Sequence, residues 1–350
     1  MSKTSASVYM LYGDSGTRKT TELMTGALYV FEQTGRKCRF VSAESAAEEI
    51  VAPAVERELL ATPLWMYKSL HPRAFLKKLQ RGEWPYMVDS AGGRTDNPEK
   101  AVGRKWFPTP AEDWAGLGGY IFEGLQSYGE LIMGDLRATQ SKAGATGETG
   151  LASPGYSECD ESLGSNAKSH YNAAQGDMLE FLTEAPKNVF DQSKGKVQYF
   201  FVSTHESKGT DGTNKTIFGP AVIGQAATDK VQKKVGLMVH HELVVTRVKD
   251  ASGAEGLKHS VRAYFMPHPD SENASINWQA IVRLPFTADP QATQKAMGSL
   301  LKRWPGGYVD LDKETLWDFL KAMDEARAVA GGGLGELMER IERERKEGKG

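Results

Sequence analysis

The chain has 350 residues, of which 40% are hydrophobic and 25% charged, and this composition excludes a collagen-like or disordered protein. The formal net charge of -2 excludes attraction of nucleic acid by the whole molecule, so such a contact must come from a local patch. Cys38 and Cys159 lack metal-ligand spacing and indicate no disulfide framework. Met1–Ser7 is short and polar, with no long apolar run after it, so we expect a cytoplasmic protein with no membrane partner.

The first elements predict a βαβ unit. Val8–Tyr12 is a short apolar run, which favours a buried strand. A helix is expected to begin at Lys19 and to stop at Gly35, because its apolar residues fall on one face. Arg39–Val41 predicts a second strand that reaches Glu44. This order favours a parallel sheet.

Two more apolar runs predict buried strands. Gly119–Phe122 ends at Glu123, and Val197–Val202 ends at Ser203–His205. We therefore predict an α/β fold with a mostly parallel sheet flanked by helices, a β-rich extension and a helical C-terminus. Helices are expected in residues 46–79, with interruptions at prolines, and in 128–136, 169–185 and 313–330; further β-like runs are 236–248, 259–266 and 275–284.

Three segments lack a regular pattern. Residues 84–110 are rich in Gly, Pro and Asp and show no period. Thr139–Gly164 and Glu206–Gly219 are rich in small and polar residues, which predicts long mobile loops. Loops of this length are usually either functional or disordered.

The segment Gly13–Thr20 carries the most specific motif. It fits the phosphate-binding pattern G-x-x-x-x-G-K-[ST] and lies between a predicted strand and a predicted helix. Its N–H groups would cradle phosphate, Lys19 would reach the β- and γ-phosphates, and Thr20 would supply a hydroxyl to Mg²⁺. We therefore expect ATP with Mg²⁺; a glycine-rich turn without a ligand is the alternative. The expected nucleotide-binding residues are Gly13, Asp14, Ser15, Gly16, Thr17, Arg18, Lys19, Thr20 and Thr21.

Arg18 stands where the pattern has glycine. Its side chain must either point away from the phosphate or touch it with its charge. The departure bears on the rate of turnover more than on binding.

Polar residues at the predicted strand ends are the catalytic candidates, together with Lys19. Ligands of α/β sheets bind at the carboxyl ends of strands, so Glu123 is expected to hold the Mg²⁺ shell and Glu44 to orient the attacking water. His205 is expected to sense the γ-phosphate and pass its state to the next loop. The alternatives are an exposed acid for Glu123, a helix cap or surface acid for Glu44, and a hydrogen-bonded histidine for His205.

These segments resemble the RecA-like branch of P-loop ATPases, and more closely the phage-encoded AAA-type proteins related to RecA/RadA recombinases. Phe40–Glu44 resembles the strand that ends in the recombinase's catalytic glutamate, and Tyr120–Ser127 resembles the Walker B strand, where Asp is commoner than Glu123. Phe201–Glu206 resembles the sensor strand, and Gly219–Gly224 a Gly-Pro-x-x-x-Gly segment. The resemblance covers about residues 5–285.

The resemblance implies a RecA-like ATPase domain over residues 1–288 and a helical C-terminal extension over 289–350. It also implies a homo-oligomer, as a ring or filament, and host cytoplasm if the chain is phage-encoded. In RecA-like proteins, the loops after the Walker B and sensor strands contact single-stranded DNA. Here these loops would be 139–164 and 206–219, and the candidate DNA contacts are Lys208, Lys215, Lys230 and Lys233.

Two alternative roles stay open for these lysines. They can be solvated surface residues, or they can reach a neighbouring subunit's γ-phosphate. The favoured function is an ATPase that acts on single-stranded DNA in phage-type recombination, annealing or replication. A nucleotide-binding regulatory or assembly protein with little turnover is the first alternative. The second, a small-molecule kinase, would need an arginine-rich lid, and 139–164 contains no arginine.

Overall fold

The computed structural model describes residues 6–68, 71–95, 97–146, 165–210, 216–221, 230–231, 233–249, 255–266, 276–278, 280–282 and 290–329. Several predictions from sequence lie outside these residues and stay untested: Lys215, the 147–164 part of the first predicted loop, the domain boundary at 288, and the chain after 329.

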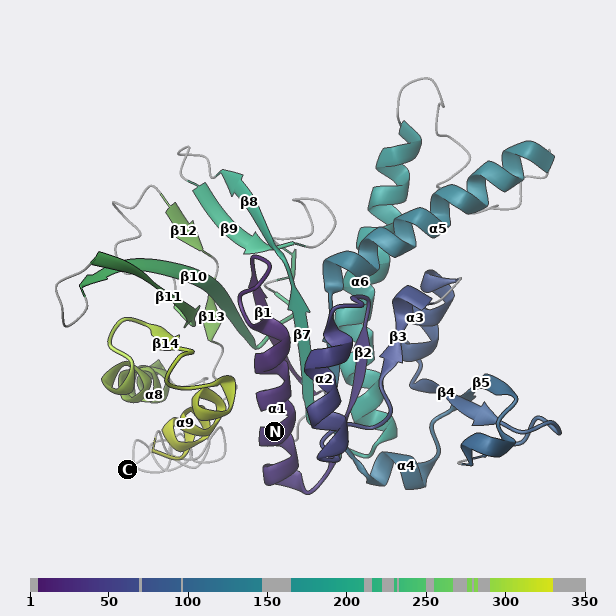
Figure 1. Cartoon of the computed structure of the whole chain (residues 1–350), viewed down its shortest axis with the longest axis horizontal. Helices are drawn as coiled ribbons and strands as arrows, with labels where there is room; N and C mark the ends of the chain where they lie inside the picture. The colour runs from purple at the N-terminus through teal and green to yellow at the C-terminus, as the bar shows by residue number, and fades with distance from the viewer. Residues whose placement is uncertain are drawn as a thin grey trace, which may run out of the picture.

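A mostly parallel sheet forms the centre of the protein (Figure 1). Its order is β14-β11-β10-β1-β7-β6-β2-β3, with β13 paired to β10. Every pair from β10 to β3 along this path is parallel, whereas β11, β13 and β14 pair in antiparallel fashion. The strands are β1 (Ser7–Gly13), β2 (Lys37–Ser42), β3 (Leu64–Trp65), β6 (Leu117–Glu123), β7 (Tyr199–Thr204), β10 (Leu237–Lys249), β11 (Glu255–Tyr264), β13 (Ile281–Val282) and β14 (Tyr308–Asp310).

Helices cover both faces of the sheet, and the side chains of β1 alternate between two cores. Val8, Met10 and Tyr12 face the core formed with α3, α5 and α6, whereas Tyr9 and Leu11 face the core formed with α1, α2, α8 and α9. This burial of both faces explains the continuous apolar runs. The helices are α1 (Lys19–Thr34), α2 (Ala47–Glu56), α3 (Pro72–Gln80), α4 (Ala111–Ala115), α5 (Leu125–Thr146), α6 (Ser165–Gln192), α8 (Pro290–Arg303) and α9 (Leu316–Val329), with short 3₁₀ turns at Met66–Lys68 and Pro98–Lys100.

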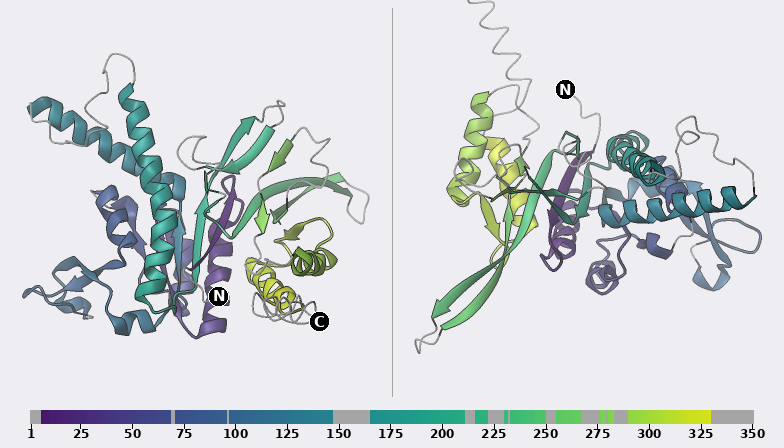
Figure 2. Two further views of the ribbon diagram at one scale, coloured as in Figure 1. Left: turned by 180° about the vertical axis from the view of Figure 1, so that it is seen from behind. Right: turned by 90° about the horizontal axis from the view of Figure 1, so that it is seen from above.

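This architecture confirms the predicted α/β fold, a mostly parallel sheet flanked by helices, with a β-rich extension and a helical C-terminus. The antiparallel β10–β11 pair projects from the sheet as a long ribbon, as Figure 2 shows. Within the described residues, no helix is both long and apolar enough to cross a membrane.

Two predicted loops are wrong in the parts that the structure describes. In the second, β8 (Glu206–Thr210) pairs in antiparallel fashion with β9 (Thr216–Pro220), and β9 also pairs with β12 (Ile276–Trp278). Ile217 and Phe218 pair across the hairpin with Gly209 and Lys208, a pairing that the small and polar composition hides. Residues 139–146 continue α5, because Ala, Gln and Lys favour a helix as much as small residues favour a loop.

Residues 84–110 hold a further hairpin that the sequence did not predict, β4 (Glu83–Val88) with β5 (Gly103–Pro108). Trp84 lies over the guanidinium of the buried Arg39, 4.2 Å from the ring centre, and Arg39 also donates to Tyr86 and Tyr120. A buried arginine needs such partners. The hairpin is therefore fixed to the sheet by a cation–π contact rather than by periodic apolar residues.

The C-terminal part completes the second core. β14 pairs with β11, and α9 packs against α1. Polar contacts tie the two helices along their length, since the Trp317 indole donates to Glu32 at 2.7 Å and the Tyr29 hydroxyl donates to Asp324. At the start of α9, the Leu316 N–H donates to the buried carboxylate of Glu22. α1 is therefore held between the sheet and α9.

Glu22 makes the stability of this contact depend on pH. Glu22 is 2% exposed, and burial raises its pKa to about 7, against the smaller opposing effects of the Leu316 N–H, Thr25 and Arg18, while Asp318 adds to the rise. Because the folded pKa lies above the unfolded value of 4.5, the contribution to stability is full below pH 4.5 and is lost as the pH rises to 7. Glu22→Gln keeps an acceptor for Leu316 without a charge.

We therefore expect Glu22→Gln to gain about 2–3 kcal/mol of unfolding free energy over the parent between pH 5 and pH 8. The measurement is urea denaturation of both proteins across this range. If the unfolding free energies of the two proteins change in parallel with pH, ionisation of Glu22 does not destabilise the fold, and the prediction is wrong.

Candidate nucleotide-binding site

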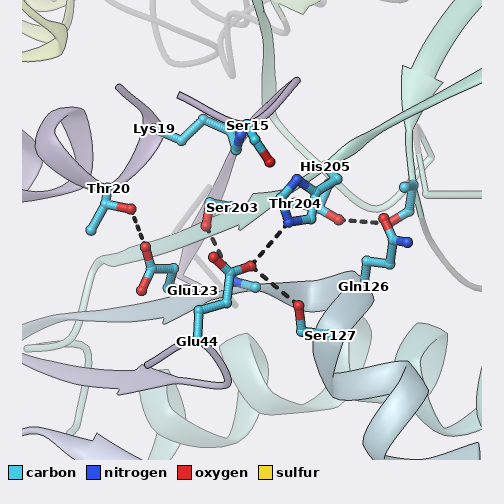
Figure 3. Close-up of polar contacts among 12 residues, drawn as sticks. Ser15, Lys19, Thr20, Glu44, Glu123, Gln126, Ser127, Ser203, Thr204 and His205 are labelled. Atoms are coloured by element: carbon cyan, nitrogen blue, oxygen red, sulfur yellow. Dashed lines mark hydrogen bonds and ion pairs between the residues drawn. The ribbon is translucent and has the colours of Figure 1, made fainter. Parts of the chain in front are cut away.

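The polar residues predicted at strand ends meet at one edge of the sheet (Figure 3). The parallel register aligns Ser42 with Glu123, and Tyr12 with Thr204. The ends of β2, β6, β7 and β1 therefore lie in one row. The phosphate-binding loop, residues 13–20, leaves β1 at this row and enters α1.

The loop backbone is held closely against β10. A Cβ on Gly13 would lie 2.2 Å from the carbonyl oxygen of His241, so only glycine fits there. His241 is buried, which lowers its pKa to about 3, and its neutral ring donates through Nδ1 to the Thr17 carbonyl at 2.9 Å. The Thr17 hydroxyl donates to the Asp14 carbonyl at 2.7 Å. The underside of the loop is thus fixed, whereas residues 14–16 are exposed to the outside.

Lys19 lies across the loop. Its ammonium donates to the carbonyls of Gly13 at 2.9 Å and Asp14 at 2.7 Å, and Thr17 Oγ1 is 3.4 Å away. Burial lowers its pKa, whereas the carboxylates of Glu44, Asp14, Glu206 and Glu123 act to raise it. Among the described residues, the hydrogen-bond acceptors of Lys19 are neutral, so its positive charge is available to an incoming anion.

Thr20 and Glu123 form the second part of the site. The Thr20 hydroxyl donates to Glu123 Oε1, and the Ser42 hydroxyl donates to Oε2 at 2.7 Å. Glu123 is 1% exposed, and burial raises its pKa against these two hydrogen bonds. The predicted placement of Glu123 at a strand end is confirmed, whereas the alternative of an exposed acid is wrong.

Glu44 and His205 form the third part. His205 Nε2 lies 3.3 Å from Glu44 Oε1, and the Ser127 hydroxyl donates to the same oxygen at 3.2 Å. The contact with His205 is the main cause of a lowered Glu44 pKa, so this carboxylate is ionised at neutral pH. Both side chains are about one-third exposed. The two strand-end residues therefore act as a pair that opens toward solvent beside the loop.

This set of groups fits a nucleoside triphosphate with Mg²⁺. The loop offers backbone N–H groups and an ammonium to phosphate, and Thr20 and Glu123 offer the hard oxygen ligands that Mg²⁺ prefers. Among the described residues, no cluster of three or more His, Cys, Asp or Glu side chains could hold a metal alone. Mg²⁺ usually keeps several waters and phosphate oxygens in its shell, so it needs few protein ligands.

The side chain of Arg18 points away from the loop, which decides between the two orientations allowed by the sequence. Its guanidinium donates to the Leu311 carbonyl at 3.0 Å and pairs with Asp312 at 2.8 Å. Its backbone takes the left-handed conformation, with φ of 60°, at the N-terminus of α1. The conformation that the motif assigns to glycine is thus kept, and the added charge is used elsewhere.

The predicted DNA-contacting lysines are separate from the phosphate-binding loop. Lys208 lies on β8, and Lys230 and Lys233 lie in a turn before β10; all three are exposed. In the described part of the chain, no acidic side chain pairs with any of the three. Thr21 follows Thr20 on the first turn of α1.

Sequence reasoning missed several residues of the site. Ser42 at the end of β2 orients Glu123, and Ser127 on α5 orients Glu44. Only the strand-end position of Ser42 could have pointed to the first, and nothing in the sequence pointed to the second. His240 and His241 are buried beside the loop, at 2% and 1% exposed. Their place directly after the apolar run Leu237–Val239 could have marked them as part of a buried strand, which lies beside β1.

Comparisons with known proteins add little to this geometry. No protein-family model matches the chain, and no curated protein matches it either. Among solved structures it is similar to a KaiC-like protein from the hyperthermophilic archaeon Pyrococcus horikoshii, with 10% sequence identity and a TM-score of 0.36 over 74% of this chain and 79% of that one. The roles of the residues therefore follow from the site alone.

Proposed function

We propose that the chain binds ATP with Mg²⁺ on the loop of residues 13–20 and hydrolyses it. One observation carries the proposal: Lys19, the Thr20–Glu123 contact and the Glu44–His205 pair converge on that loop from four strand ends. A structural turn without a ligand would not need a buried carboxylate and a Glu44–His205 contact beside a lysine whose hydrogen-bond partners, among the described residues, are the loop's own neutral oxygens.

Each group has a role that its geometry supports. Loop N–H groups bind phosphate oxygens, and Lys19 turns its ammonium from the loop carbonyls to the β- and γ-phosphates. Thr20 and Glu123 hold the Mg²⁺ shell, directly or through water; the bound ion supplies charge neutralisation of the phosphates. Ser42 keeps Glu123 oriented after Thr20 is engaged.

Glu44 is the candidate base. Its lowered pKa keeps it ionised, and one oxygen is already held by His205 and Ser127. A carboxylate of this kind orients a water and accepts its proton late, as the phosphoryl group leaves. His205, bonded to Glu44, is placed to respond when that carboxylate changes partner.

Lys19→Ala is expected to abolish binding of Mg·ATP while the fold stays intact, because the point charge on the β- and γ-phosphates is lost. Calorimetric titration measures the affinity. Lys37→Ala, which removes an exposed lysine paired with Glu58, is the matched control and should bind as the parent does. Unchanged affinity of Lys19→Ala would reject the phosphate site.

Glu44→Gln is expected to keep ATP affinity and to lower turnover by at least about tenfold, since an amide cannot accept the proton. Glu48→Gln tests an exposed acid of the same region that contacts Lys68, and it should turn over at the parent rate. Steady-state phosphate release measures both. If Glu44→Gln keeps the parent rate, the base must be sought at Glu123.

A second candidate function is nucleotide binding with little turnover, in a regulatory or assembly protein. The observation in its favour is the left-handed Arg18, which places a strained residue in the loop. Turnover measured with and without single-stranded DNA separates the two. Stimulation supports the ATPase, and tight binding without turnover supports the regulatory protein.

We further propose that the ATPase acts on single-stranded DNA, as a ring or filament of identical chains, in phage-type recombination, annealing or replication. The support is a direct connection from the site to the hairpin that carries Lys208. Glu206 follows His205, begins β8, and pairs with the buried His240 at 2.9 Å. Two residues further along β8 stands the exposed Lys208. A change at His205 is thus passed to the hairpin over a few residues.

Binding of single-stranded DNA is therefore expected to require ATP or a non-hydrolysable analogue. The triple change Lys208→Ala, Lys230→Ala and Lys233→Ala should weaken it and flatten its salt dependence by a log–log slope of about 0.7 for each phosphate that is no longer neutralised. ATP affinity should not change. Fluorescence anisotropy of a labelled oligonucleotide across a salt series is the measurement.

Lys187→Ala is the control for this experiment, because Lys187 is exposed on α6 and precedes β7, at the opposite edge of the sheet. No binding at low salt with analogue present would reject the DNA function and favour the regulatory one. Binding without nucleotide would leave a DNA-binding protein that His205 does not switch.

A further inference from the structure

Arg18 connects the phosphate-binding loop to the C-terminal part of the chain. Its guanidinium contacts the Leu311 carbonyl and Asp312, 293 and 294 residues further along, between β14 and α9. The Asp312 side chain is 24% exposed and that of Arg18 is 44% exposed. Two guanidinium nitrogens are used, Nη1 for the Leu311 carbonyl and Nη2 for the Asp312 carboxylate.

The backbone of Arg18 gives this contact its importance. A non-glycine residue in the left-handed conformation is strained, and such strain persists only where the surroundings fix it. In the loop, Gly16 also has a positive φ, but glycine carries no such strain. Arg18 is thus the position in residues 13–20 where the loop's shape needs an external restraint.

A second anchor lies one turn further on α1. Glu22 accepts the N–H of Leu316 at the first residue of α9. Arg18 and Glu22 together fasten the segment 311–316 to the N-terminal turn of α1, where phosphate binds in the proposed function. The other side of the loop is fixed by His241 of β10, which is joined to β14 through β11.

We propose that Arg18 and Asp312 are a positioning pair, through which the docked C-terminal segment, residues 307–329, holds the phosphate-binding loop in its binding conformation. Nucleotide affinity then follows the docking of this segment. A partner or modification that displaces it would release nucleotide without touching the site. The role in affinity rests on the proposed function, whereas the restraint on the loop does not.

Three variants test the pair by titration with Mg·ATP. Asp312→Ala leaves the strained Arg18 with the Leu311 carbonyl but without its ionic partner, and affinity should fall about three- to tenfold, because a smaller fraction of molecules has a competent loop. Arg18→Ala should do the same. Arg18→Gly should bind at least as tightly as the parent, because glycine takes this conformation without strain.

The double variant Arg18→Gly with Asp312→Ala completes a mutant cycle, and Asp312→Ala should have no effect in that background. Lys313→Ala is the matched control, since Lys313 pairs with Asp310 in the same turn. It should bind as the parent does. Thermal midpoints of all variants identify any change that comes from unfolding.

Amide hydrogen exchange without nucleotide tests the restraint separately. Amides of residues 13–18 should exchange about three- to tenfold faster in Asp312→Ala than in Lys313→Ala, because the loop opens locally. Equal exchange, or equal affinity of Asp312→Ala and the parent, overturns the proposal. So does an Arg18→Gly variant that loses as much affinity as Arg18→Ala, since the guanidinium would then act on the nucleotide itself. A parent protein that binds no Mg·ATP rejects the proposed function alone.

Discussion

The buried carboxylate of Glu123 requires hydrogen-bond donors from the surrounding residues. Its carboxylate lies at the end of β6, 1% exposed, where an unpartnered charge would cost several kcal/mol. Hydroxyls from Thr20 and Ser42 supply the donors, and each hydrogen bond to a charged group is worth about 1.5–3 kcal/mol. These hydroxyls reach Glu123 only because β2 pairs with β6 in parallel register and α1 begins directly above. The strand order, the loop and the carboxylate are therefore parts of one arrangement.

The sequence predicted the features of this site that are local. The motif Gly13–Thr20 needs a strand before it and a helix after it, and both are read from neighbouring residues. Glu44, Glu123 and His205 were found because apolar runs end at them, and parallel strands place such ends at one edge. What the sequence did not predict is which of them touch, since the Glu44–His205 contact requires the order of strands as well as their ends.

The errors have the same origin. In the hairpin of β8 and β9, β9 also pairs with the distant strand β12, and β4 and β5 are fixed by Arg39, which lies before them in the chain. His241 has a polar side chain in a position that only the packing of β10 against the loop makes buried. In each case the stabilising partner is distant in sequence, so no window of neighbouring residues contains the information.

Arg18 shows how such a distant partner changes the meaning of a motif. A glycine at this position would be free of strain, whereas a side chain in the left-handed conformation costs about 1–2 kcal/mol. A half-exposed ion pair returns about 0–1 kcal/mol, so the pair with Asp312 does not repay the strain as stability. The free energy that remains uncompensated is small, and it is located in the loop itself. The population of the loop's binding conformation therefore responds to small changes in the contacts of Arg18. A loop with glycine at this position would have no contact through which the C-terminal segment could change that population.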